Sequence, residues 1–315
     1  MTKITGDTDI IVSELLKGNI AALPTETVYG LGANALNEDA VLKIFETKER
    51  PAFNPLIVHV YEVDELKKYS SDIPEKVYDL AEIFCPGPLT FVLKKKNIIP
   101  DIVTAGNDSV GLRIPSHNLF REVLRSSGLP LAAPSANRSG KISPTTAGEV
   151  LSELDGRIDF ILDGGKCAVG IESTVISFLN NEIKILRHGI ITKEEIEKIT
   201  GKISDSEDSV PLSPGMLKIH YAPSTPLYKC ADPAKAAERT GLKTGILDPG
   251  KYSDLREAAF HLFSDLRKLD ESGFEMLLYS EAENSGIGVA INDRLKRAGS
   301  GEIVFTGNSF KIIYG

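Results

Sequence analysis

Short apolar runs, each closed by glycine, proline or a polar loop, constrain the fold of this chain most strongly. The runs have the length of buried strands and alternate irregularly with helical patterns. Strands are expected at 20–24, 56–60, 89–93, 110–114, 131–134, 160–162, 174–178 and 183–186. Helices are expected at 7–17, 39–47, 75–84, 119–126 and 146–154. We therefore expect an α/β (α+β) domain with a twisted, mixed open sheet and helices outside it.

The composition changes near residue 202. Residues 202–212 are polar and acidic, which is typical of a linker. Beyond this segment the strand and helix patterns return, with strands at 244–247 and 276–279 and helices at 254–269 and 288–297. We expect a first domain over 1–201, a linker over 202–226, and a smaller, doubly wound, Rossmann-like α/β domain over 227–315.

Charge and cysteine content exclude several classes of protein. The formal net charge of −8 over 315 residues argues against stable, non-specific nucleic-acid binding, although it allows a local basic pocket. The three cysteines are far apart, which disfavours a disulfide framework or a cysteine zinc site. No signal peptide and no long apolar segment is visible. We expect a cytoplasmic protein without a membrane partner.

Common nucleotide and hydrolase signatures, such as GxxxxGK[ST], GxGxxG, HExxH and GxSxG, are absent. One unusual stretch instead runs from Leu23 to Gly32 and carries two hydroxyls, a carboxylate and a phenol directly after a strand. A strand-to-helix turn with local capping explains it about as well as a small-molecule pocket does. Its spacing alone does not decide between the two.

Lys48 and Arg50 lie two residues apart at the end of a helical pattern. In an extended segment both side chains would point the same way and could face one polyanion such as a triphosphate. A solvated surface is the more common explanation of such a pair. His59 lies within the apolar run 56–60, where a satisfied core histidine is more common than a ligand.

A dense set of hydroxyls and an amide follows the predicted strand at 131–134, over residues 135–145. It offers donors for a phosphate or an adenine edge, although a plain turn with a helix N-cap accounts for it nearly as well. Arg113, Ser173 and Arg187 each place a polar group in or beside an apolar strand. Because a buried arginine must be paired, several such residues in one domain favour a pocket for a charged ligand.

Together and in this order, the motifs resemble those of the YrdC-like family, in particular its two-domain L-threonylcarbamoyladenylate synthases. The motifs are PTETVYGLGANA, KERPAFNPLIVHV, CPGPLTFVL, GLRIP, PSANRSGKISPT, IESTVI, ILRHGIIT and SPGMLKIHYAP. The resemblance covers residues 10–225 closely, and GIGVAINDRLKRA is similar to part of the family's second domain. Leu217-Lys218-Ile219 departs from the family's basic-aromatic-basic triplet.

The resemblance implies a nucleotidyltransferase that condenses L-threonine, bicarbonate or CO2 and ATP into threonylcarbamoyl-AMP and pyrophosphate. The product would serve the tRNA threonylcarbamoyl-transfer machinery, which makes threonylcarbamoyladenosine at tRNA position 37. The implied fold has a large concave cavity, and the linker would fold over the active site. Mg²⁺ would be carried with ATP, without a dedicated protein cage.

The resemblance also assigns roles to individual residues. ATP would be bound by Lys48, Arg50, Asn54, Ser109, Asn137, Thr145, Arg187 and Tyr221. L-threonine would be bound by Thr27, His59, Arg113, Ser135 and Ser173, with Arg113 paired to its carboxylate. Lys48 and Arg50 would act in catalysis, and no residue is expected to ligate a metal.

Two other functions are compatible with parts of this pattern. One is a non-catalytic RNA- or nucleotide-binding module on the same concave surface, which the net charge and the few aromatic residues disfavour. The other is a carbamoyl-transfer domain. It normally belongs to a longer chain with zinc-finger-like cysteines, which are absent from this sequence.

Overall fold

The computed structural model describes residues 1–205, 220–306 and 309–313. The chain divides into two compact units. The first unit comprises Met1–Ser139 and Ser143–Met216, and the second comprises Gly140–Ile142 and Leu217–Gly315.

The predicted linker, 202–226, falls largely on residues 206–219, which lie outside the described residues, as does the Leu217-Lys218-Ile219 triplet. Two ends of the predicted linker are described. Ser204 and Asp205 pair with Lys184 and Ile185 in the first unit's sheet, and 220–226 is hydrogen-bonded within the second unit. There the Thr225 amide donates to Asp270 Oδ1 at 2.7 Å. The linker's place over the active site stays a prediction.

The first unit contains an eleven-stranded sheet in the order β1-β8-β2-β3-β7-β4-β6-β5-β9-β10-β11. The sheet contains both parallel pairs such as β4–β6 and antiparallel pairs such as β5–β6, which confirms the expected mixed sheet. Its strands are β1 (Lys3–Thr5), β2 (Ala21–Leu23), β3 (Gly30–Asn34), β4 (Ile57–His59), β5 (Leu89–Lys94), β6 (Ser109–Arg113), β7 (Leu131–Ala132), β8 (Phe160–Leu162), β9 (Thr174–Ser177), β10 (Lys184–Arg187) and β11 (Ser204–Asp205).

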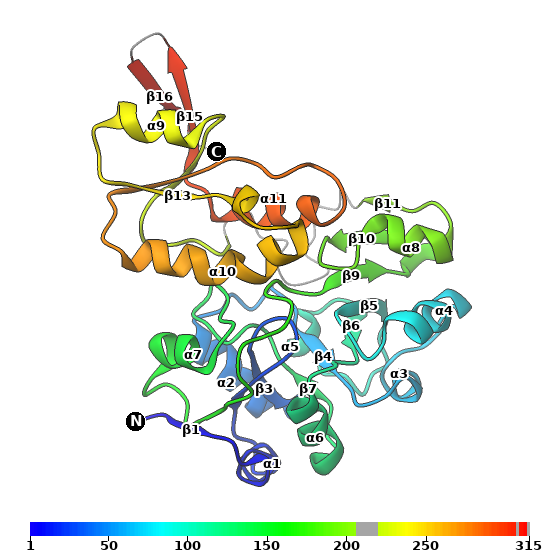
Figure 1. Cartoon of the computed structure of the whole chain (residues 1–315). Coiled ribbons are helices and arrows are strands. Elements are labelled where there is room, and N and C mark those ends of the chain that lie inside the picture. The colour runs from blue at the N-terminus through cyan, green and yellow to red at the C-terminus, as the bar shows by residue number, and fades with distance from the viewer. Residues whose placement is uncertain (206–219, 307–308, 314–315) are drawn as a thin grey trace. The chain divides into compact units, whose positions relative to one another are not determined.

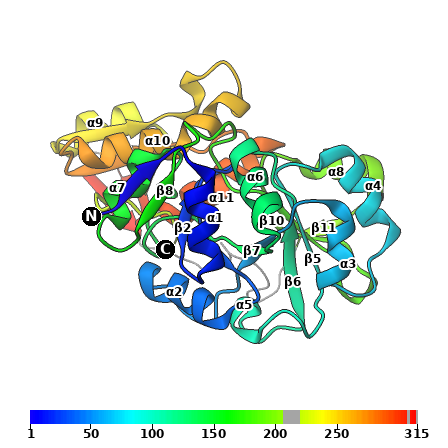
Figure 2. The same ribbon diagram turned by 90° about the horizontal axis from the view of Figure 1, so that it is seen from below.

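Eight α-helices of the first unit are described, namely α1 (Thr8–Leu16), α2 (Glu38–Lys48), α3 (Leu66–Tyr69), α4 (Glu75–Phe84), α5 (Asp101–Thr104), α6 (Asn118–Ser127), α7 (Ala147–Leu154) and α8 (Lys193–Thr200). Helices α1 and α6 pack together against strands β2, β7 and β8 and form one core cluster with them (Figures 1 and 2). The core therefore lies between the sheet and its helices, as the apolar face of each element requires.

The stretch from Leu23 to Gly32 continues into a strand, so the strand-to-helix turn, one of the two alternatives considered for it, is wrong. Its last residues begin β3, which pairs antiparallel with β2. Gly32 allows this pairing to be close, because a Cβ there would lie 2.7 Å from Leu23 Cδ1. A glycine in a strand commonly marks such a close approach.

The second unit has a five-stranded sheet in the order β13-β14-β12-β15-β16. Strands β12 (Leu227–Lys229), β13 (Thr244–Leu247), β14 (Met276–Tyr279) and β15 (Gly301–Thr306) run parallel, and β16 (Ser309–Ile313) pairs antiparallel with β15. Helices α9 (Pro233–Thr240), α10 (Leu255–Glu271) and α11 (Ile287–Ala298) follow its first three strands. This smaller α/β domain confirms the expected fold class. Within the described residues, no helix is long and apolar enough to cross a membrane.

Candidate active site

A row of five aligned residues crosses the first unit's sheet. His59 of β4 pairs with Arg113 of β6, and Arg113 pairs with Thr90 of β5. Val175 of β9 and Arg187 of β10 continue the row. Aligned residues on neighbouring strands point to the same face of a sheet. Three residues that the sequence singled out therefore share one face.

Arg113, in the middle of this row, is buried and held by three groups. Its Nη2 donates to Glu26 Oε1 at 2.6 Å, and its Nη1 donates to Thr27 Oγ1 at 3.0 Å. Its Nε donates to the Gly87 carbonyl at 3.4 Å. The second oxygen of Glu26 accepts the Ser116 amide at 3.1 Å. This cation is thus paired with a buried carboxylate, as its burial requires.

Ser173 links the other end of the row. Arg187 donates to Ser173 twice, from Nε to the carbonyl and from Nη2 to Oγ, both at 3.0 Å. The Ser173 hydroxyl also shares a hydrogen bond of 2.8 Å with the Thr90 hydroxyl. The network connects Arg187 to the strand position beside Arg113. Four predicted residues, Thr27, Arg113, Ser173 and Arg187, therefore join through hydrogen bonds and strand pairing.

His59 is buried at the edge of the row. Its Nδ1 lies 3.3 Å from the Leu131 carbonyl, and its ring packs on Phe120 with 5.1 Å between the centroids. Burial, reinforced by the nearby charge of Arg113, lowers the pKa of His59 to about 3. The imidazole is therefore neutral at ordinary pH. With Nδ1–H facing the carbonyl, Nε2 is a hydrogen-bond acceptor.

Lys48 is the last residue of α2, and its ammonium is buried. It donates to the carbonyls of Ser135 and Asn137, and Ser139 returns a backbone hydrogen bond of 2.8 Å to the Lys48 carbonyl. Burial lowers the pKa of Lys48 well below its usual range, and the charge of Arg50 lowers it further. These hydrogen bonds fix Lys48 to the loop that contains Ser135 and Asn137.

Arg50 and Asn54 form a second buried group. Arg50 donates from Nε to the Asn54 carbonyl at 3.2 Å and from Nη2 to the Pro55 carbonyl at 2.9 Å. Asn54 is 1 % exposed, and neither the oxygen nor the nitrogen of its side-chain amide has a hydrogen-bond partner among the described residues. A buried amide without partners is uncommon and indicates a place for a ligand or water. The solvated surface considered for Lys48 and Arg50 is wrong, since both are buried.

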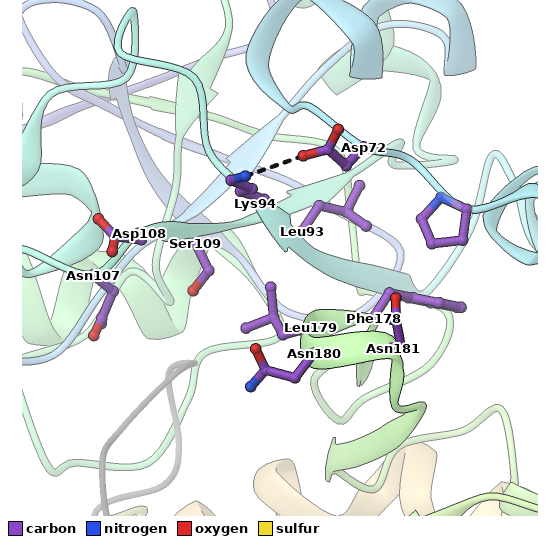
Figure 3. A pocket seen from close by; sticks show the side chains of 11 residues that line it. Asp72, Leu93, Lys94, Asn107, Asp108, Ser109, Phe178, Leu179, Asn180 and Asn181 are labelled. Atoms are coloured by element: carbon purple, nitrogen blue, oxygen red, sulfur yellow. Dashed lines mark hydrogen bonds and ion pairs between the residues drawn. The ribbon is translucent and has the colours of Figure 1, made fainter.

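Ser109 lies at the opposite end of β6 from Arg113 and opens onto a cavity of about 600 Å³ (Figure 3). Strand pairing aligns Ser109 with Lys94, which forms an ion pair of 3.2 Å with Asp72 across the cavity rim. Leu93, Phe178 and Leu179 supply apolar walls. The cavity therefore combines an apolar wall with a polar rim.

Thr145 and Tyr221 each contact neighbours within their own unit. The Thr145 hydroxyl donates to Glu149 Oε2 at 3.0 Å, next to the N-terminus of α7. Tyr221 belongs to the second unit, where its ring packs on Phe263 with 5.2 Å between the centroids. The predicted contact of Tyr221 with nucleotide stays a prediction.

The residues predicted from the sequence do not include Glu26 and Thr90, which the structure places in the hydrogen-bond network of the candidate site. Glu26 had a signal, because a carboxylate in a mostly apolar stretch must be paired if it is buried. Thr90 lies within an apolar strand pattern and gave no comparable signal. Among the described residues, no group of three or more His, Cys, Asp or Glu side chains could hold a metal ion.

Two protein-family models match consecutive parts of this chain. The Sua5_yciO_yrdC family model, described as "Telomere recombination", matches residues 13–189, more than half of the chain. The chain belongs to the Sua5/YciO/YrdC family. A second model, described as "Threonylcarbamoyl-AMP synthase, C-terminal domain", matches residues 191–300.

Members of the Sua5/YciO/YrdC family resemble this chain over nearly its whole length. Threonylcarbamoyl-AMP synthase of Pyrococcus abyssi is 40% identical, with 91% of this chain and 92% of the relative covered. Threonylcarbamoyl-AMP synthase of Bacillus subtilis is also 40% identical, with 92% of each covered. A crystal structure of P. abyssi Sua5 complexed with L-threonine superposes with a TM-score of 0.87 at 39% identity. It covers 92% of this chain and 93% of the other.

Proposed function

We propose that this chain is an L-threonylcarbamoyladenylate synthase and, in reaction class, a nucleotidyltransferase. It would convert L-threonine, bicarbonate or CO2 and ATP into threonylcarbamoyl-AMP and pyrophosphate. The observation that carries the proposal is the near full-length likeness to the P. abyssi protein, whose structure was solved with L-threonine. Relatives that match over nine tenths of the chain carry the same synthase name.

The environment of Arg113 supports an amino-acid site on the sheet. Arg113 would take the threonine carboxylate, and the hydroxyls of Thr27 and Ser173 together with neutral His59 would surround the rest of the molecule. Ser135 would complete the site from its loop. The threonine ammonium would lose one proton to solvent, its nitrogen would attack the carbon of CO2 as one C–O π bond opens, and a second proton would leave the nitrogen for solvent to give a carbamate anion. Such a step depends mainly on positioning and on charge neutralisation.

The second group of residues supports a nucleotide site. Lys48, Arg50, Asn54 and Ser109 would face the phosphates, and the buried, unpartnered Asn54 amide supplies donors for their oxygens. Asn137, Thr145, Arg187 and Tyr221 would contact the rest of the nucleotide. The carbamate oxygen would attack the α-phosphorus, and the bond to the bridging β-phosphate oxygen would break. Pyrophosphate carries away the negative charge that the cations have stabilised.

Mg²⁺ would enter with ATP. The side chains proposed around the phosphates are cations, amides and hydroxyls, a set that contains no carboxylate ligand for Mg²⁺. Mg²⁺ commonly uses substrate phosphates and water for most of its ligands. When bound, it would neutralise phosphate charge. Lys48 and Arg50 would orient the phosphate chain from the protein side.

The proposed product is an activated carbamoyl donor with a mixed anhydride, so an acceptor amine must consume it. We propose the tRNA threonylcarbamoyl-transfer machinery as that consumer, with threonylcarbamoyladenosine at tRNA position 37 as the end product.

Purified protein incubated with ATP, Mg²⁺, L-threonine and bicarbonate tests the proposed reaction. We expect pyrophosphate release that requires both threonine and bicarbonate, and a product with the mass of threonylcarbamoyl-AMP. Tight RNA binding without this product would contradict the synthase and favour an RNA-binding module.

A further inference from the structure

We propose that Glu26 is a positioning residue for the amino-acid substrate, acting through Arg113. The proposal rests on the proposed function, in which Arg113 takes the threonine carboxylate. Glu26 would fix the orientation of the guanidinium and cancel its charge, so that the donors aimed at the substrate are set before it binds.

The two partners of Glu26 require a carboxylate. Oε1 accepts from Arg113 Nη2 at 2.6 Å and Oε2 accepts from the Ser116 amide at 3.1 Å. Both partners are donors, so both terminal atoms of residue 26 must be acceptors. A glutamine has one acceptor and one donor, and would therefore satisfy only one of them. The buried site thus selects Glu on hydrogen-bonding grounds alone.

The contacts of Arg113 leave two N–H groups of its guanidinium available to a substrate. A guanidinium has about five N–H donors, and here Nε, Nη1 and Nη2 each use one, on Gly87, Thr27 and Glu26. One N–H on each terminal nitrogen remains without a partner among the described residues. Two N–H donors of one guanidinium match the two oxygens of a carboxylate. Glu26 and Thr27 therefore decide which donors stay available.

Charge leads to the same conclusion. Glu26 and Arg113 are both less than a tenth exposed and together are neutral. A zwitterionic amino acid is neutral as well, so its entry brings no net charge into a buried site. An amide at position 26 would leave Arg113 as a buried cation, which turns toward any available acceptor and away from its substrate orientation.

The test compares Glu26→Gln with wild type, with Glu195→Gln as the matched control. Glu195 caps α8 in the same unit and lies outside the proposed site. We expect the KM for L-threonine to rise about tenfold to a hundredfold in Glu26→Gln. We expect the KM for ATP to stay within about twofold, and Glu195→Gln to leave both values unchanged.

Glu26→Asp serves as the second variant if Glu26→Gln does not fold. Aspartate keeps both acceptors but is one methylene too short to reach Arg113 and Ser116 together, so an intermediate KM for threonine is expected. An unchanged threonine KM in the folded variants, or equal rises for threonine and ATP, would overturn the role of Glu26. Failure of the wild type to form product would instead refute the proposed function itself.

Discussion

Arg113 and Lys48 are both buried cations of the first unit, but they are stabilised in opposite ways. Arg113 lies on a strand and is neutralised by the Glu26 carboxylate at 2.6 Å. Lys48 ends helix α2 and donates to two neutral backbone carbonyls. Among the described residues, Lys48 forms no ion pair.

The difference suggests a division of charge between the two substrates. A neutralised arginine suits a zwitterion such as L-threonine, because the site gains no net charge. A cation whose hydrogen bonds go only to backbone carbonyls suits a polyphosphate, because the ligand supplies negative charge beside it. Burial, and next the charge of Arg50, lower the pKa of Lys48, so a negative ligand beside it would stabilise its charged form.

The largest effect is expected from Arg113→Met. It leaves the Glu26 carboxylate buried without its cation, which costs about 3–5 kcal/mol of unfolding free energy. Urea unfolding measures this cost, and product formation should be lost. The double variant Arg113→Met/Glu26→Gln should recover part of the stability but no activity. If Arg113→Met is as stable as wild type, the Arg113–Glu26 ion pair does not offset the cost of burying the Glu26 carboxylate.

A smaller loss is expected from Lys48→Met. The change removes a cation but leaves only two backbone carbonyls without their donor, which costs about 1–3 kcal/mol. The same urea experiment measures it, and the KM for ATP should rise more than the KM for threonine. If Lys48→Met costs as much stability as Arg113→Met, the two cations are not stabilised differently.

The smallest effect is a pH dependence due to His59. The folded protein holds His59 neutral down to about pH 3, whereas an unperturbed histidine titrates near 6.5. The unfolded chain thus binds the extra proton below pH 6.5, and the free energy of unfolding falls as pH falls. The slope is about 1.4 kcal/mol per pH unit. Between pH 6 and pH 5 the free energy of unfolding should fall more steeply in wild type than in His59→Gln, by about this amount.

Elements with strong local signals were predicted well from the sequence. Helix α4 has the predicted bounds, 75–84, and α1 begins after Asp7, which caps its first turn. Elements without such signals were missed. Strand β3 contains Gly30 and Gly32, which have low strand propensity, and it forms because its partner strand β2 accepts it.

The contacts within the candidate site were even harder to predict from the sequence than the strands. The ordered motifs identified the site residues, but the hydrogen-bond partners of these residues lie far away in the sequence. Glu26 lies 87 positions from Arg113, and Ser135 lies 87 positions from Lys48. Local patterns do not reveal such pairs. The burial of Lys48 and Arg50 was hidden for the same reason, because the groups that satisfy Lys48 belong to a loop formed much later in the chain.

The contrast between Lys48 and Arg113 is tested most directly by calorimetry of Mg²⁺–ATP binding in buffers of different ionisation enthalpy. Burial lowers the pKa of Lys48, and a phosphate beside it would raise this pKa again, so wild type should take up protons when Mg²⁺–ATP binds below the pH at which an ordinary lysine titrates. Lys48→Arg should show less uptake, because arginine stays protonated in both states. Equal uptake by the two proteins would contradict the division of charge.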